Sequence, residues 1–235
     1  MKNLFFIILL SMAANITFGQ QPTPGMRSYN QFDTAPNGFI NSFAPAPEVK
    51  STSVYLYDYW RTANIFLKDS TKLTNLNVKI DLKEDELDIQ YNGTVKVLPF
   101  RKLLALSFTS GDGGAEIYIN GASIFGSTHP YYDQLFQILR EGEVSLYSKS
   151  YAQIIEASTN QALGLKIDEK VVVKKKYFII YKQNFTAVGK KSDLKKELKG
   201  IFGEDVLPLL KKVNPKHEED LLALVSELDS LTKQQ

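Results

Sequence analysis

The chain of 235 residues contains no cysteine. Disulfide bonds, thiolate zinc sites, iron–sulfur clusters and cysteine nucleophiles are therefore excluded, as is a lipid anchor on a cysteine beside a leader peptide. Without disulfide bonds, the fold has to be stabilised by its hydrophobic core. A chain of this length can bury such a core, because larger domains bury a larger fraction of their surface.

The sequence also lacks an excess of charge of one sign. It has 28 basic and 26 acidic residues, which gives a formal net charge of +2. Proteins that bind nucleic acid neutralise its phosphates with a surplus of lysine and arginine, so we predict no nucleic-acid partner. The apolar share of 43% and the charged share of 23% are typical of a globular protein with a core.

Long apolar runs are absent except close to the N-terminus. Lys2 precedes an apolar run over residues 4–14, and the small residues Thr17 and Gly19 follow in the spacing that a signal peptidase recognises. This pattern predicts a signal peptide over residues 1–19, cleaved near Gly19 or Gln20. An uncleaved anchor is disfavoured, because the apolar run is shorter than the ~20 residues that span a bilayer.

Cleavage of this leader would place the mature protein in the periplasm or outside the cell. No later segment is apolar over enough residues to span a membrane, so we expect no transmembrane segment after leader removal. Peripheral association with the outer membrane, through a partner, is compatible with this prediction.

The mature chain divides into segments of different pattern. Residues 20–50 are rich in Pro, Asn, Ser and Ala and are predicted to form a flexible arm, although their large apolar residues leave open that they fold onto a partner. Residues 51–190 follow a period of two, in which Val78 and Ile80 alternate with polar residues such as Lys79. This alternation predicts antiparallel strands with one buried face and one wet face.

Turn residues separate the predicted strands at regular intervals. Asn92-Gly93, the strongest two-residue hairpin signal, joins two alternating runs. The pattern continues over residues 103–108, 116–119, 135–139, 144–151, 171–173, 177–181 and 185–188. The predicted fold class is α+β, mainly β: an antiparallel β-meander that forms a sandwich or a partly open barrel, followed by a cluster of short C-terminal helices.

Residues 191–235 change to a helical period. Ser192 is the predicted N-cap of a first helix that ends at Gly203, and Asn214-Pro215 is expected to open the last helix. One face of that last helix carries Leu221, Leu224, Val225 and Leu228. We expect this face to pack on the sheet, and its presentation to another protein is the alternative.

An aromatic group supplies the candidate binding surface. Tyr55, Tyr57 and Tyr59 share one face of a predicted strand by parity, and Trp60 follows them. Such a face could stack on a sugar or a peptide. Aromatic residues in β-proteins more often pack in the core or across strands, and both interpretations stay open at this point.

No motif in the sequence indicates catalysis or metal binding. No recognised motif places a nucleophile or a carboxylate beside His129 or His217. Residues 121–125 resemble a nucleophile elbow but lack its closing glycine, so we do not expect the strained strand-to-helix turn that exposes a nucleophilic serine. A solvated hairpin tip is the interpretation of the acidic residues Asp81, Glu84, Asp85, Glu86 and Asp88. We therefore predict no catalytic residue, no metal site and no cofactor.

Three stretches carry a resemblance to known proteins. They are residues 87–94, residues 141–147, and residues 202–231 with their run of Glu218-Glu219-Asp220-Leu221. In these stretches, and in a leader that ends in Phe-Gly-Gln-Gln, the chain resembles a group of uncharacterised exported proteins common in Bacteroidetes. No activity is established for that group, so the resemblance assigns no catalytic residue.

The absence of an acid–base or metal constellation in a chain with a leader favours a non-enzymatic cell-envelope protein that binds another envelope protein or component. Two alternatives stay open. A carboxylate-based hydrolase acting on glycans would need two carboxylates that face each other across a cleft. A small-ligand or lipid carrier would need an apolar cavity lined by the β-sheet.

Overall fold

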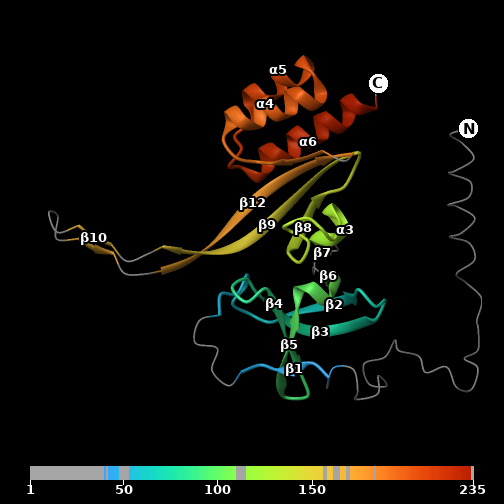
Figure 1. Cartoon of the computed structure of the whole chain (residues 1–235), viewed down its shortest axis with the longest axis vertical. Coiled ribbons are helices and arrows are strands. Elements are labelled where there is room, and N and C mark those ends of the chain that lie inside the picture. Colours follow the sequence, from blue (N-terminus) through green and yellow to red (C-terminus); the bar gives the residue numbers. More distant parts are fainter. Residues whose placement is uncertain are drawn as a thin grey trace, which may run out of the picture.

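The computed structural model describes residue 40 and residues 42–47, 53–109, 115–155, 158–160, 165–167, 170–182 and 184–233. The predicted signal peptide and most of the predicted flexible arm lie outside these residues. Within them, an antiparallel sheet of eleven strands has the order β1-β5-β4-β3-β2-β6-β7-β8-β9-β12-β13, and a cluster of short helices follows it (Figure 1). The predicted fold class is confirmed, and the sheet is open rather than closed into a barrel.

The first part of the sheet contains the predicted meander, in which β2 to β5 pair in chain order, while β6 returns to pair with β2. Its strands are β1 (Ala44–Pro45), β2 (Arg61–Leu67), β3 (Lys72–Asp81), β4 (Glu86–Tyr91), β5 (Thr94–Pro99), β6 (Leu103–Thr109) and β7 (Ala115–Asn120). Asn92 and Gly93 join β4 to β5 with φ values of 48° and 74°, as a type I′ hairpin turn requires. The buried faces of these strands enclose one apolar core, which includes Ile65, Leu87 and Leu106.

The short edge strand β1 pairs with β5, so that Ala44 lies opposite Val97. Beside it, Ile40 and Phe43 are buried in the core of the meander. The described end of the segment predicted to be a flexible arm is therefore packed against the sheet. Its large apolar residues explain the difference, because burying them stabilises the contact.

The second part of the sheet contains a long hairpin. The strands of this part are β8 (Leu135–Arg140), β9 (Val144–Ile155), β12 (Lys170–Tyr181) and β13 (Asn184–Ala187), and the long hairpin consists of β9 and β12. A separate pair, β10 (Ser158–Asn160) and β11 (Leu165–Ile167), lies beyond the ends of β9 and β12. The prediction of two runs, 171–173 and 177–181, is wrong in one respect. The three lysines between the runs continue the strand, because β12 pairs with β9 without interruption from Lys170 to Tyr181.

The neighbours of this hairpin are much shorter than the hairpin itself. β8 pairs with β9 only as far out as Ser148, and β13 pairs with β12 only over residues 178–181. The outer part, residues 149–155 of β9 and 170–176 of β12, is therefore a two-stranded extension that projects from the rest of the sheet (Figure 1). We call this extension the ribbon.

An aromatic cluster packs on one face of the sheet at the base of the hairpin. Phe178 is fully buried there between Phe136 and Phe185, with ring centroids 5.3 and 5.2 Å away. The short helix α3 (Gly121–Phe125) covers the cluster and follows β7 directly. The helix starts where the Asn120 side chain accepts a hydrogen bond from the Ala122 N–H, and Ser123 is not among the described residues with positive φ, so the turn is an ordinary capped helix start and not a strained nucleophile elbow.

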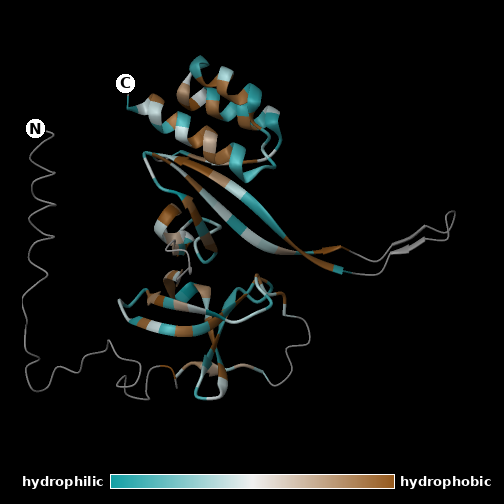
Figure 2. Cartoon of the chain, turned by 180° about the vertical axis from the view of Figure 1, so that it is seen from behind, coloured by the Kyte–Doolittle hydropathy of each residue, from teal (hydrophilic) through white to brown (hydrophobic). Residues whose placement is uncertain are grey.

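The C-terminal helices cover the opposite face at the base of the hairpin. They are α4 (Lys191–Phe202), α5 (Leu207–Lys212) and α6 (Glu218–Thr232). The 3-10 turn η3 (Glu204–Val206) joins α4 to α5, and a second 3-10 turn, η1 (Phe100–Lys102), lies between β5 and β6. The predicted apolar face of α6 packs against Leu146 and Ile179 rather than being presented to solvent. Figure 2 shows the alternation of apolar and polar residues on these helices.

Two of the predicted helix starts are wrong. The first helix begins at Lys191, so Ser192 lies inside it, where its hydroxyl donates to the Asp193 carboxylate. The last helix begins at Glu218, because the Asn214 side chain accepts the N–H of Lys216 in a local turn. Gly203, with φ of 77°, ends the first helix as predicted. No helix within the described residues has the length and apolar character needed to cross a membrane.

Candidate functional site: a groove beside the ribbon

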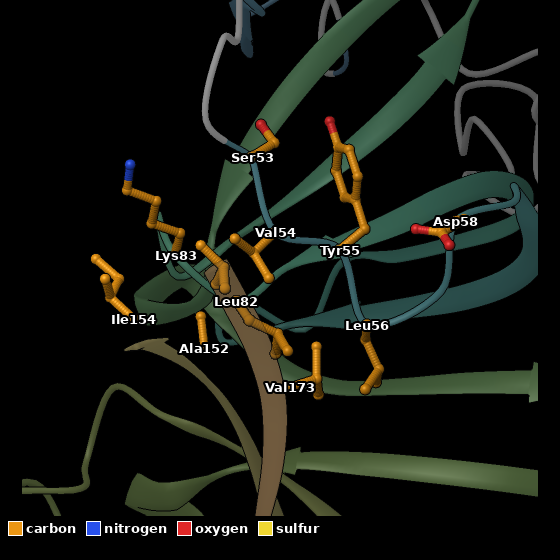
Figure 3. A pocket seen from close by; sticks show the side chains of 11 residues that line it. Ser53, Val54, Tyr55, Leu56, Asp58, Leu82, Lys83, Ala152, Ile154 and Val173 are labelled. Atoms are coloured by element: carbon orange, nitrogen blue, oxygen red, sulfur yellow. The ribbon is translucent and has the colours of Figure 1, made fainter. Parts of the chain in front are cut away.

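A hollow lies between the ribbon and residues 53–58. Its volume is about 720 Å³. Figure 3 shows its walls: Leu56 and Leu82 face Ala152 and Val173 across the hollow. We call this hollow the groove.

The ribbon contributes an apolar wall whose side chains are exposed and that no described helix covers. Ile154 pairs with Val171 and Ala152 with Val173, and residues that lie opposite each other in a ladder point to the same face. The exposed fractions are 52% for Ile154 and 43% for both Val171 and Val173. These three residues are half of the six strongly exposed large apolar side chains among the described residues, so the exposed apolar surface is concentrated here.

Alternation along the strands explains why this wall is apolar. Leu146 on β9 and Ile179 on β12 have the same parity as Ile154 and Val173, so all four point to one face of the hairpin. The C-terminal helices cover this face near the base, where Leu146 and Ile179 are buried. The same apolar face then continues onto the ribbon, beyond the reach of the helices.

The opposite wall is held in place by β3. Leu56 donates its N–H to the Ile80 carbonyl at 2.9 Å, and Leu82 donates to the Val54 carbonyl at 2.8 Å. The Tyr55 hydroxyl donates to the Asp88 carboxylate at 2.6 Å. Since both backbone and side chain are tied to the meander, this wall is preformed, as in most ligand sites.

A carboxylate network fixes the far end of the same wall. The Glu116 carboxylate accepts hydrogen bonds from the hydroxyls of Tyr57 and Tyr118, from Gln137 and from Arg61, whose Nη1 lies 2.6 Å away. The Arg61 guanidinium also stacks over the Tyr57 ring, 4.5 Å from its centroid. These donors satisfy the hydrogen-bonding capacity of the part-buried carboxylate. The network therefore has a structural role, which is to hold this end of the wall in place.

The electrostatics of this network follow from its hydrogen bonds. Burial raises the pKa of Glu116, but the hydrogen bonds from Tyr118, Tyr57 and Arg61 outweigh burial and hold that pKa below its ordinary value. Burial, followed by the hydrogen bond to Glu116, raises the pKa of both Tyr57 and Tyr118. The carboxylate therefore stays ionised and the hydroxyls stay protonated at neutral pH.

The aromatic residues of the predicted binding surface, Tyr55, Tyr57, Tyr59 and Trp60, do not form one continuous surface in the structure. Tyr55 forms an isolated bridge with Asp81 and residues 56–59 form a bend, so the three tyrosines do not share a strand face. Tyr55 and Tyr57 are half-buried and bound to carboxylates, whereas Tyr59 is exposed. The Lys79 ammonium lies over the rings of both Tyr55 and Trp60. Tyr55 alone of the four lines the groove.

The interpretation of the acidic cluster as a solvated hairpin tip is wrong for two of its residues. Asp81 and Asp88 are buried, with exposed fractions of 0% and 2%. Asp81 accepts the N–H groups of Lys83 and Glu84 and so closes the β3–β4 turn, and Asp88 accepts the Tyr55 hydroxyl. Sequence reasoning missed this because the covering residues 53–58 lie far away in the chain.

The remaining candidate residues have structural surroundings. His129 packs against Phe125, with ring centroids 4.7 Å apart, and its Nδ1 accepts the Tyr131 N–H. His217 precedes α6 and lies 3.2 Å from the Asn214 amide nitrogen. Among the described residues, no three His, Asp or Glu side chains are grouped as a metal site requires.

The groove itself supplies little acid–base chemistry. Asp58 and Lys83 are the charged residues among those that line it. A glycoside hydrolase needs a pair of carboxylates, and the described lining residues contain one carboxylate. Comparison with known proteins finds no matching family, no matching curated protein and no matching solved structure.

Proposed function

We propose that the protein is a non-enzymatic cell-envelope protein that binds another envelope protein or component in the groove. The observation that supports this most is the uncovered apolar face of the ribbon at Ile154, Val171 and Val173. Burying apolar surface is the main source of binding free energy, and a partner that covers this face would gain it. Because the wall at residues 53–58 is already held in place, little conformational entropy is lost there when a partner binds.

Carriage of a small apolar ligand or lipid is the second candidate. The volume of about 720 Å³ falls within the range of small-molecule sites, and apolar residues such as Leu56, Ile154 and Val173 line it together with polar ones. The projecting ribbon favours the protein partner, since a small ligand would not need strands that extend beyond the rest of the sheet. The two candidates differ in the mass of the bound molecule.

Photocrosslinking in the native envelope tests the proposal. With a photoreactive amino acid in place of Val173, we expect a discrete covalent adduct of protein mass; an adduct of lipid mass would support the carrier instead. Leu104 is the matched control, because it is as exposed as Val173 but lies on β6, outside the groove lining. The proposal fails if the same adduct forms at both positions.

The partner identified in this way should then be tested with purified proteins. Replacing both Val171 and Val173 by asparagine adds polar atoms to an exposed surface and should leave the unfolding temperature nearly unchanged. We expect this Val171→Asn/Val173→Asn variant to lose at least about tenfold in affinity, because two apolar contacts are removed. Unchanged affinity would show that the partner binds elsewhere.

A further inference from the structure

The charged residues of the two strands β9 and β12 all have one sign, whereas the segment that joins these strands contains Glu156, Asp168 and Glu169. The charged side chains of β9 and β12 are Lys149, Lys170, Lys174, Lys175 and Lys176, with no acidic residue on either strand. The chain as a whole is nearly neutral, with 28 basic and 26 acidic residues, so this is a local concentration. A positive surface of this kind selects partners of negative charge.

Two of these lysines are free to meet a partner. Lys175 is engaged by the Glu218 carboxylate at 3.1 Å, and Lys149 lies over the Tyr131 ring. Lys170 and Lys174 are exposed and form no ion pair with any residue that the structure describes. Both have even numbers, so they point to the face of β12 opposite to Val171 and Val173.

The outer edge of the ribbon is open on the β12 side. β13 pairs with β12 from Phe178 to Tyr181, which leaves residues 170–176 without a second neighbour among the described strands. Such an edge offers backbone N–H and C=O groups to an incoming strand. The groove lies along one face of this edge and the free lysines lie on the other.

The charge pattern disfavours one occupant of this edge. In a symmetric pair of two copies through β12, lysines would lie beside lysines, and like charges on neighbouring strands are destabilising. Lysine on an edge strand is a common means of preventing such self-pairing. The same lysines would stabilise a strand that carries carboxylates on that face.

We propose that the groove binds an extended segment of a partner protein in which apolar and acidic residues alternate, paired as an added strand with residues 170–176 of β12. Its apolar side chains pack on Val171 and Val173, and its carboxylates lie next to Lys170 and Lys174. This inference deepens the proposed function and depends on it. It adds the chemistry and the conformation of the bound segment.

Binding of labelled synthetic peptides to the purified mature protein tests this inference. The probe is a fluorescein-labelled peptide of alternating valine and glutamate, and the comparison peptide has glutamine in place of each glutamate. We expect the glutamate peptide to bind at least about tenfold more tightly, with an affinity that falls as salt is added. Equal binding of the two peptides would overturn the acidic part of the inference.

Charge reversal on the protein gives the matched comparison. Lys170→Glu/Lys174→Glu should lose the preference for the glutamate peptide. Lys195→Glu/Lys212→Glu changes the net charge equally on exposed positions of α4 and α5, and it should keep the preference. A loss of the preference in both variants would show that net charge, not the ribbon, is responsible, and would overturn the inference.

The remaining outcomes separate this inference from the proposed function. If neither peptide binds, the inference is wrong, whereas crosslinking at Val173 still decides whether the groove has a partner. Vesicles that contain phosphatidylglycerol provide the last comparison. If the protein binds these vesicles through Lys170 and Lys174 but binds no peptide, the ribbon recognises an anionic membrane and the proposed strand pairing is contradicted.

Discussion

Replacing Phe178 by alanine is expected to lower the free energy of unfolding by about 3–5 kcal/mol, because it opens a cavity in the aromatic cluster. The ring is fully buried and stacks on Phe185, with an interplanar angle of 17°. It also meets the Phe136 and Tyr131 rings edge to face, at 5.3 and 5.6 Å between centroids. Urea denaturation followed by circular dichroism measures the loss.

The size of this effect makes a second variant necessary. Phe178→Leu keeps most of the volume, so it should cost about half as much or less and remain folded. Tyr132→Ala is the control, since Tyr132 is exposed on the same part of the protein and should change stability by less than about 0.5 kcal/mol. Equal losses for Phe178→Ala and Tyr132→Ala would contradict the packing described for the base of the hairpin.

Replacing Glu116 by alanine is expected to cost about 3 kcal/mol at neutral pH, because it removes the acceptor of four side chains and leaves the Arg61 guanidinium without its counter-ion. The side chains of Arg61 and Glu116 are 18% and 20% exposed, so water can compensate for only part of the loss. Glu84→Ala, at an exposed position of the β3–β4 turn, is the control and should have little effect.

The Glu116 contribution should depend on pH with a defined sign. Hydrogen bonds hold the pKa of Glu116 in the folded protein below that of the unfolded chain. The stabilisation is therefore complete above the ordinary pKa of glutamate and disappears as the pH falls through the folded-state value. In urea titrations at pH 7 and at progressively lower pH, the wild type and Glu116→Ala should converge. A gap that widens in acid would refute this assignment.

Local sequence signals were sufficient for most of the strands and for several turns. Asn92-Gly93 predicted the β4–β5 hairpin, because positive φ values at both central positions are tolerated by this residue pair. Gly203 predicted the end of α4 for the same reason. Alternating apolar residues predicted which strand faces are buried, as Val78 and Ile80 show with exposed fractions of 1% and 2%.

Features that depend on distant contacts were not predictable in this way. In the sequence, the lysines at positions 174–176 indicate an interruption between two strands, yet their pairing with β9 makes them part of the continuous strand β12. The burial of Asp81 and Asp88 depends on residues 53–58, which cross over the end of β3. Asn214 carries the signature of a helix cap, but its side chain is engaged in a local turn, so the helix begins later.

The groove was the least predictable feature. Its walls come from parts of the chain about a hundred residues apart, and no local pattern brings Leu56 to Val173. The ribbon also contains three consecutive valines, residues 171–173, and a continuous apolar run is typical of a buried strand. The ribbon projects beyond the rest of the sheet because its neighbours β8 and β13 are short. The lengths of these two strands are a property of the assembled sheet and not of a local sequence pattern. Sequence reasoning therefore selected the aromatic residues 55–60 instead.

Hydrogen–deuterium exchange of the mature protein, alone and bound to the partner recovered by crosslinking, tests the central claim most directly. If a partner strand pairs with the ribbon, amides of residues 170–176 should exchange more slowly in the complex, together with those near Leu56 and Leu82 on the opposite wall. Protection confined to α4, α5 and α6, with the ribbon unchanged, would contradict the claim that the groove is the binding site.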